Sequence, residues 1–119
     1  MLSDPISYKV AGVATNHPRT AVGTEFNEYS VSDGTSVVRV GSSKTKGRVR
    51  KFVSKTATKV AADPISAVNQ SVNAVVTVTL SNASFGFTTA ELKALVLDAA
   101  DFLTNTSGAN TDKILGGER

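Results

Sequence analysis

The residues best suited to chemistry in this sequence form a run of basic side chains. Eight of the thirteen Lys and Arg residues lie between Arg39 and Lys59, and no Asp or Glu lies between Asp33 and Asp63. This segment carries a net charge of +8, whereas the other five basic and ten acidic residues sum to −5. A local excess of positive charge without acidic partners is typical of a surface that binds a polyanion such as nucleic acid.

Three lysines within this segment are regularly spaced. Lys51, Lys55 and Lys59 are four residues apart. Because alternate side chains of a β-strand share a face, the three ammonium groups would form a stripe along one face of a sheet. The stripe has two interpretations: it binds a polyanion, or it keeps an exposed edge strand from pairing with other chains. The clustering of the charges favours the first.

The sequence offers little for catalysis. His17 is the only histidine, and Asn16-His17-Pro18 is a turn signal that predicts a solvent-exposed ring. Asp98 and Asp101 are expected on a solvated helix face. We predict no catalytic residues, no cofactor and no metal site, and the absence of Cys excludes disulfide bonds and Cys-ligated metals. An enzyme is therefore not expected.

The elements that position the basic residues are predicted to be β-strands. Val, Ile and Thr make up 33 of the 119 residues, and β-branched side chains favour pleated sheets. Asp33-Gly34 is a two-residue hairpin signal. The patterns predict strands over residues 6–13, 24–31, 35–43, 48–60 and 68–80, a polar turn at 44–47 and a loop at 61–67.

The C-terminal part of the chain has helical periodicity instead. Thr88-Thr89-Ala90-Glu91 is a capping box, which predicts a helix from Thr89 to Thr104. A break at residues 106–109 precedes a second short helix, Asp112 to Leu115, which Gly116-Gly117 ends. The apolar face of the first helix consists of Leu92, Leu95, Val96, Ala99, Phe102 and Leu103.

These elements predict one domain over residues 1–119, with a hairpin and sheet in 1–87 and a helical segment in 88–119. One helix covers about 10–12 Å of a five-stranded sheet that is about 20–24 Å wide, so a second copy of the chain is expected to complete the cover. The N-terminus lacks the regions of a signal peptide, and no apolar run approaches the roughly 20 residues that span a bilayer. We therefore expect no membrane partner.

The order of these pieces resembles the coat proteins of single-stranded RNA bacteriophages, the levivirus group, over the whole chain. The residues that carry the resemblance are the basic strand Arg50-Lys51-Phe52-Val53-Ser54-Lys55, the strand Asn69 to Leu80, the helix Glu91 to Leu103 and the tail Ile114-Leu115-Gly116-Gly117-Glu118.

The resemblance implies an α+β fold in which an N-terminal hairpin precedes an antiparallel sheet of about five strands and two C-terminal helices follow. Two chains would form an interlocked dimer with a continuous sheet. Dimers would assemble in the bacterial cytoplasm into the icosahedral T=3 shell of a virion, commonly 180 copies, around genomic RNA. An RNA hairpin would be bound as translational repressor and packaging signal. The loop residues Asp63, Pro64 and Ile65 would lie between dimers at the symmetry axes.

The resemblance also implies which residues contact RNA. They are Arg39, Ser43, Lys44, Lys46, Arg48, Lys51, Val53, Lys55, Ser71 and Asn73. Lys51 and Lys55 would contact phosphates, and the amide of Asn73 would bind an adenine edge. The chain departs from well-studied members by having Ser71 in place of an aromatic and Val53 in place of a hydroxyl. Two other functions remain open: a small dimeric RNA-binding regulator that forms no shell, and a structural protein that assembles without nucleic acid.

Overall fold

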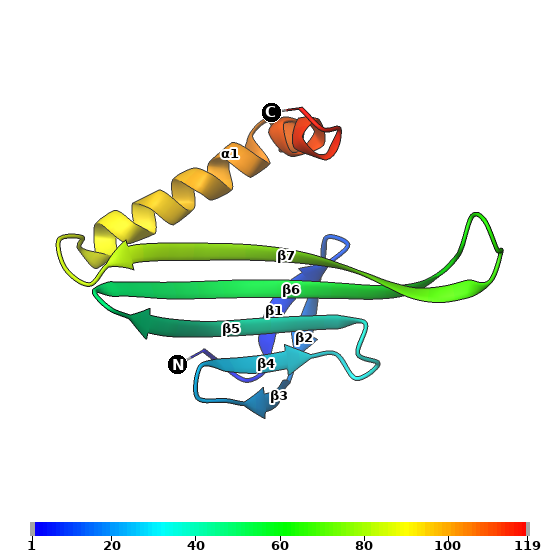
Figure 1. Ribbon diagram of the computed structural model, residues 1–119, viewed down its shortest axis with the longest axis horizontal. Helices are drawn as coiled ribbons and strands as arrows, with labels where there is room; N and C mark the ends of the chain where they lie inside the picture. Colours follow the sequence, from blue (N-terminus) through cyan, green and yellow to red (C-terminus); the bar gives the residue numbers. More distant parts are fainter. Residues whose placement is uncertain (1, 119) are drawn as a thin grey trace. The chain divides into compact units, whose positions relative to one another are not determined.

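The computed structural model describes residues 2–118, which form seven strands and one helix (Figure 1). The chain divides into two compact units, Met1–Ser81 and Asn82–Arg119. The elements are β1 (Ile6–Val10), β2 (Val13–His17), β3 (Arg19–Val22), β4 (Phe26–Ser30), β5 (Ser36–Thr45), β6 (Arg48–Ala62), β7 (Asn69–Ala83) and α1 (Thr89–Leu115).

The N-terminal hairpin consists of β1 and β2, which form a separate two-stranded antiparallel sheet. The prediction of one strand over residues 6–13 was wrong, because the chain reverses at Ala11 and Gly12. Both residues have positive φ, 51° at Ala11 and 83° at Gly12. Residues 11 and 12 form the tight turn between the paired residues Val10 and Val13. Glycine at position 12 adopts positive φ without the steric cost that a side chain adds.

The main sheet contains five strands in the order β3-β4-β5-β6-β7, which confirms the predicted antiparallel sheet of about five strands. β6 and β7 are the longest, with 15 residues each. The sequence did not predict β3, a strand of four residues whose pairing with β4 is interrupted by a register shift between Arg19 and Ala21. β5 and β6 are joined by Lys46 and Gly47 alone, with φ of 70° at Gly47.

The connection between β4 and β5 differs from the predicted two-residue hairpin. It spans residues 31–35, and the Val31 amide donates to the Ser36 carbonyl at 3.1 Å. Inside it, the Asp33 carboxylate accepts from the hydroxyl of Thr35 at 2.7 Å and from its amide at 3.0 Å. These bonds favour the ionised carboxylate and hold the pKa of Asp33 below its usual value.

The loop between β6 and β7 makes hydrogen bonds within itself. The Asp63 amide donates to the Val68 carbonyl at 3.0 Å, and the Asp63 carbonyl accepts from the Ala67 amide at 2.8 Å. The Asp63 carboxylate accepts from the Ile65 amide at 2.8 Å, and the side chain of Ile65 is 97% exposed. Because β6 extends to Ala62, the loop begins two residues later than predicted.

The buried residues of the first unit lie between the hairpin and the main sheet. Tyr29 and Val38 are buried, as are His17 and Ser36. The His17 Nε2 atom is 2.8 Å from the Ser36 hydroxyl oxygen, and Nδ1 is 3.0 Å from the Thr15 carbonyl. The prediction of an exposed His17 was therefore wrong, because these two hydrogen bonds offset the cost of burying the imidazole.

The C-terminal unit contains one helical element where two helices were predicted. Thr88 caps α1 by accepting from the Glu91 amide at 3.2 Å, as predicted. The backbone leaves helical geometry at Asn105 to Gly108, which overlaps the predicted break at 106–109, but it becomes helical again at residue 109 rather than 112. Across the kink, the Asn110 amide group donates to the Phe102 carbonyl at 3.0 Å, and the Thr111 hydroxyl donates to the Leu103 carbonyl at 2.6 Å. These bonds satisfy carbonyls that the interruption leaves without a helical amide partner, and they join the two helical stretches on either side of it.

Candidate nucleic-acid interface

The hairpin covers one of the two faces of the main sheet. Residues directly paired in an antiparallel sheet project to the same side, and Lys55 is paired with Val38. The Lys55 ammonium donates to the Lys9 carbonyl at 3.1 Å and lies 5.2 Å from the centroid of the Tyr8 ring. Both contacts are made with β1, so the side of Lys55 is the hairpin-side face of the sheet.

Four of the predicted RNA-binding residues lie on the hairpin-side face. Alternation along β6 places Lys51 and Val53 with Lys55, as the sequence predicted. Val53 is paired with Val40 and half-buried, whereas Lys51 is paired with Ser42 and exposed. Lys51 and Lys55 therefore share one face of β6, as predicted, but the Lys55 ammonium contacts the hairpin. Lys44, paired with Val49, also projects to this side, and Lys46 lies in the turn.

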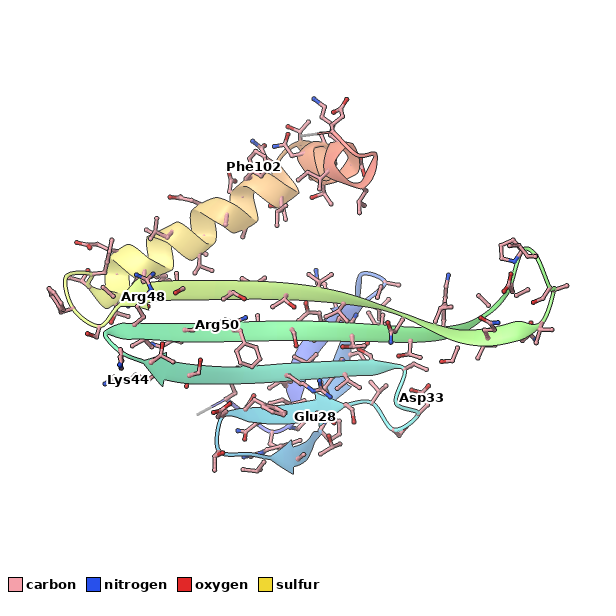
Figure 2. All side chains as sticks on the ribbon, viewed as in Figure 1. Glu28, Asp33, Lys44, Arg48, Arg50 and Phe102 are labelled. Carbon is pink, nitrogen blue, oxygen red and sulfur yellow. The ribbon has the colours of Figure 1, made fainter. Side chains whose placement is uncertain are left out.

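The opposite side, which we call the open face, carries a different set of polar and aromatic residues. Figure 2 labels Glu28 on β4 and Arg48 and Arg50 on β6. The strand register assigns to the open face Phe26, Glu28, Arg39, Gly41, Ser43, Thr45, Arg48, Arg50, Phe52 and Ser54. Arg39, Ser43 and Arg48 of the predicted site therefore lie here, on the side away from Lys51 and Lys55.

The polar side of β7 belongs to the open face as well. The Nε and one terminal nitrogen of Arg48 each donate to the Ser81 hydroxyl at 3.3 Å, which places Ser81 on the side of Arg48. Alternation along β7 then places Asn73 and Ser71 on the same side. The predicted site is thus divided. One sheet face holds its arginines, Asn73 and the serines, and the other holds its β6 lysines.

The open face also carries Phe26, Arg50 and Phe52, which the predicted site omitted. Phe26 and Phe52 are both paired with Gly41, one on each side. The Arg39 guanidinium lies 5.6 Å from the Phe26 ring centroid, and that of Arg50 lies 6.0 Å from the Phe52 centroid. The signal available in the sequence was the alternation Arg50-x-Phe52, which puts a cation and a ring on one face of the strand.

The charge of the open face is only partly neutralised. Arg39 forms an ion pair with Glu28 at 2.9 Å. Within the register-defined set, Glu28 is the single carboxylate against Arg39, Arg48 and Arg50. In the described part of the chain, no cluster of three or more potential metal ligands is present.

Two surfaces of the single chain expose apolar residues. On β7, which forms one edge of the sheet, all residues from Asn69 to Thr79 are exposed, including Val72, Val75, Val76 and Val78. None of the α1 residues is buried. In the predicted dimer interface, Leu95, Val96, Ala99, Phe102 and Leu103 are exposed and Leu92 is half-buried. Within residues 2–118, no helix is long and apolar enough to cross a bilayer.

An antiparallel five-stranded sheet with an N-terminal hairpin on one face, followed by a kinked helix, defines an α+β protein. Solved structures of the same fold come from virus-like particles. The chain matches the virus-like particle of bacteriophage AVE019 with a TM-score of 0.78 and 14% identity, over 98% of this chain and 97% of that one.

Two other particles match the chain. The TM-score is 0.66 for the virus-like particle of Beihai levi-like virus 21, at 10% identity over 96% of this chain and 93% of that one. The TM-score is 0.57 for the virus-like particle of bacteriophage PQ-465, at 17% identity over 88% of this chain and 89% of that one. No protein-family model matches the chain, and no curated protein matches its sequence. The resemblance to levivirus coat proteins is thereby confirmed at the level of the fold.

Proposed function

We propose that this chain is the coat protein of a single-stranded RNA bacteriophage, whose dimers assemble into an icosahedral shell around RNA. The observation that carries the proposal is the fold shared with the AVE019 virus-like particle over 98% of the chain. The neighbours are viral shells rather than enzymes, and they match the chain over nearly its full length. This supports a structural role in the virion.

The dimer would form along β7. A 15-residue edge strand leaves a row of backbone donors and acceptors unpaired, and pairing with the same strand of a second chain would satisfy it. Val72 and Val76 lie on the hairpin-side face by alternation and are 41% and 63% exposed. Covering them with the apolar side of the partner's α1 would stabilise the dimer by part of the roughly 1.5–3 kcal/mol that complete burial of a valine provides, because each is already partly covered in the single chain.

The open face is the side proposed to meet RNA. In the proposed dimer, the hairpin and the partner's helix occupy the hairpin-side face, so the open face is left for the packaged nucleic acid. Its arginines and the amide of Asn73 supply phosphate and base donors. Binding of a specific RNA hairpin, with repression of translation, would use the same face. The loop residues Asp63, Pro64 and Ile65 are proposed to contact neighbouring dimers, a role that suits the 97% exposure of Ile65.

The experiment is expression of this chain alone, followed by size-exclusion chromatography, negative-stain microscopy and the 260/280 nm absorbance ratio. We expect closed particles with the absorbance of packaged RNA. Discrete dimers that bind RNA but never assemble would contradict the proposal and support the small regulator. Shells with the absorbance of pure protein would refute RNA packaging and support a structural protein that assembles without nucleic acid.

A further inference from the structure

We propose that the open face contains a stacking site for unpaired bases of single-stranded RNA, formed by Phe26 and Phe52 on either side of Gly41 together with the guanidinium groups of Arg39 and Arg50, which lie over the rings. The inference rests on the proposed function and names the contact by which the coat protein would hold RNA. The sequence had predicted phosphate contacts at Lys51 and Lys55, which lie on the other face.

Three paired residues form a row across the main sheet. Phe26, Gly41 and Phe52 lie opposite one another on β4, β5 and β6. With strands about 4.8 Å apart, the two phenylalanine backbones are about 10 Å apart, and the residue between them has no side chain. A Cβ atom at position 41 would lie 2.6 Å from the Phe26 Cβ and 2.3 Å from the Glu25 carbonyl oxygen. Glycine at 41 therefore leaves the two rings as the apolar surface of this row.

The two rings leave aromatic surface accessible to different extents. Phe26 is 40% exposed and Phe52 is half-buried, and neither ring contributes to the core between hairpin and sheet, which lies on the other face. Phenylalanine has no hydrogen-bonding group, so its ring binds a nucleobase through its flat face, whatever the base. The open face is thus suited to RNA contacts that do not depend on sequence.

Positive charges lie close to both rings. The guanidinium groups lie within 6.0 Å of the ring centroids, where cation–π attraction orients them and leaves N–H groups for phosphate oxygens. The Arg39 side chain also pairs with Glu28, whereas within the described residues the Arg50 side chain has no ion pair or hydrogen bond and lies over the Phe52 ring. Arg50 beside Phe52 is therefore the strongest candidate for joint contact with a phosphate and its base. The three arginines against one carboxylate favour a polyanion over a second protein as the occupant.

The test uses Phe52→Trp as a fluorescent reporter, because the chain contains no tryptophan. Ser42→Trp is the matched control, since Ser42 is exposed, neighbours Gly41 in sequence and projects to the hairpin-side face. Purified full-length variants are titrated with single-stranded RNA of mixed sequence and, separately, with inorganic polyphosphate, which carries charge without bases. We expect RNA to quench the tryptophan at position 52 but not at 42, and polyphosphate to quench neither.

A second variant measures affinity. Phe52→Leu keeps apolar volume but removes the ring, and we expect RNA affinity to fall about tenfold, with Phe52→Trp retaining or exceeding the original affinity. Three outcomes would each overturn the stacking site. The tryptophan at position 52 is quenched by polyphosphate as well as by RNA, or it is not quenched by RNA, or its fluorescence changes on assembly without RNA. If RNA-filled particles form normally while quenching is absent, the coat function stands and the stacking site fails. If no particles form, the coat function itself fails.

Discussion

Replacement of Gly41 by alanine tests the close approach of β4 and β5. The added methyl group would lie 2.3 Å from the Glu25 carbonyl oxygen and 2.6 Å from the Phe26 Cβ. Neither atom is at the end of a flexible side chain, so the β4 backbone has to move. The Ser42 amide donates to the same Glu25 carbonyl at 2.9 Å, and that hydrogen bond would be strained by the movement.

The expected loss of stability combines three contributions. Overpacking of a fitted site costs about 1–3 kcal/mol. Loss of one hydrogen bond costs about 1 kcal/mol. Restriction of the unfolded chain by alanine offsets about 0.4–1 kcal/mol of this. The net destabilisation of Gly41→Ala is therefore about 2 kcal/mol.

Urea denaturation at fixed protein concentration measures this loss, because the stability of a self-associating protein depends on its concentration. With a slope of about 1–3 kcal/mol per molar urea, the midpoint should fall by about 1 M. Ser42→Ala is the control and should change the midpoint little, because Ser42 is exposed and its backbone amide is retained. An unchanged midpoint for Gly41→Ala with an unchanged slope would refute the close approach.

Four further outcomes are expected. Val76→Asp puts a charge on the apolar side of β7 and should abolish dimers in sedimentation, whereas Thr77→Asp on the open face should leave dimers intact and weaken RNA binding. His17→Ala removes a buried ring with two hydrogen bonds and should lower the free energy of unfolding by about 2–4 kcal/mol, measured by thermal unfolding. A loss under about 0.5 kcal/mol, which is typical of an exposed residue, would contradict the burial of His17. Lys55→Ala should speed hydrogen exchange in β1 and β2 specifically, by removing the bond to the Lys9 carbonyl. The pKa of Asp33 is lowered in the folded chain, so its contribution to folding stability is complete above the ordinary pKa of 3.8 and is lost as pH falls through the folded pKa. Asp33→Asn should therefore make stability depend less on pH below about pH 4. An unaltered dependence of stability on pH would count against the Thr35 bonds.

The sequence predicted the sheet well because strand alternation is a local property. The strands that became β5, β6 and β7 were placed within a few residues, and the cap at Thr88 was correct. The turn at Ala11 and Gly12 was missed because alanine rarely adopts positive φ, so only the glycine marked it. The predicted break at residues 106–109 falls on the non-helical residues Asn105 to Gly108, but the chain becomes helical again three residues before the predicted start of the second helix. The hydrogen bonds of Asn110 and Thr111 across this interruption do not follow from helical periodicity.

In the candidate site, strand alternation correctly grouped Lys51, Val53 and Lys55 on one face of β6, but alternation does not say which face of the sheet a distant segment covers. The contacts of Lys55 with Tyr8 and Lys9 of β1 show that the hairpin covers the face of these three residues. The position of His17 depended likewise on Ser36, a residue 19 positions away.

The unpaired 15-residue edge of β7 also has a kinetic consequence. If a second chain completes this edge, productive folding includes a bimolecular step, and its half-time shortens as the chain concentration rises. A newly made chain at low concentration spends longer with valines and backbone groups available to other strands, the condition in which misassembly competes. The yield of correctly paired dimers would therefore rise more than proportionally with the rate at which the chain is synthesised. Abundant, locally concentrated translation would then favour correct pairing of this chain over its loss.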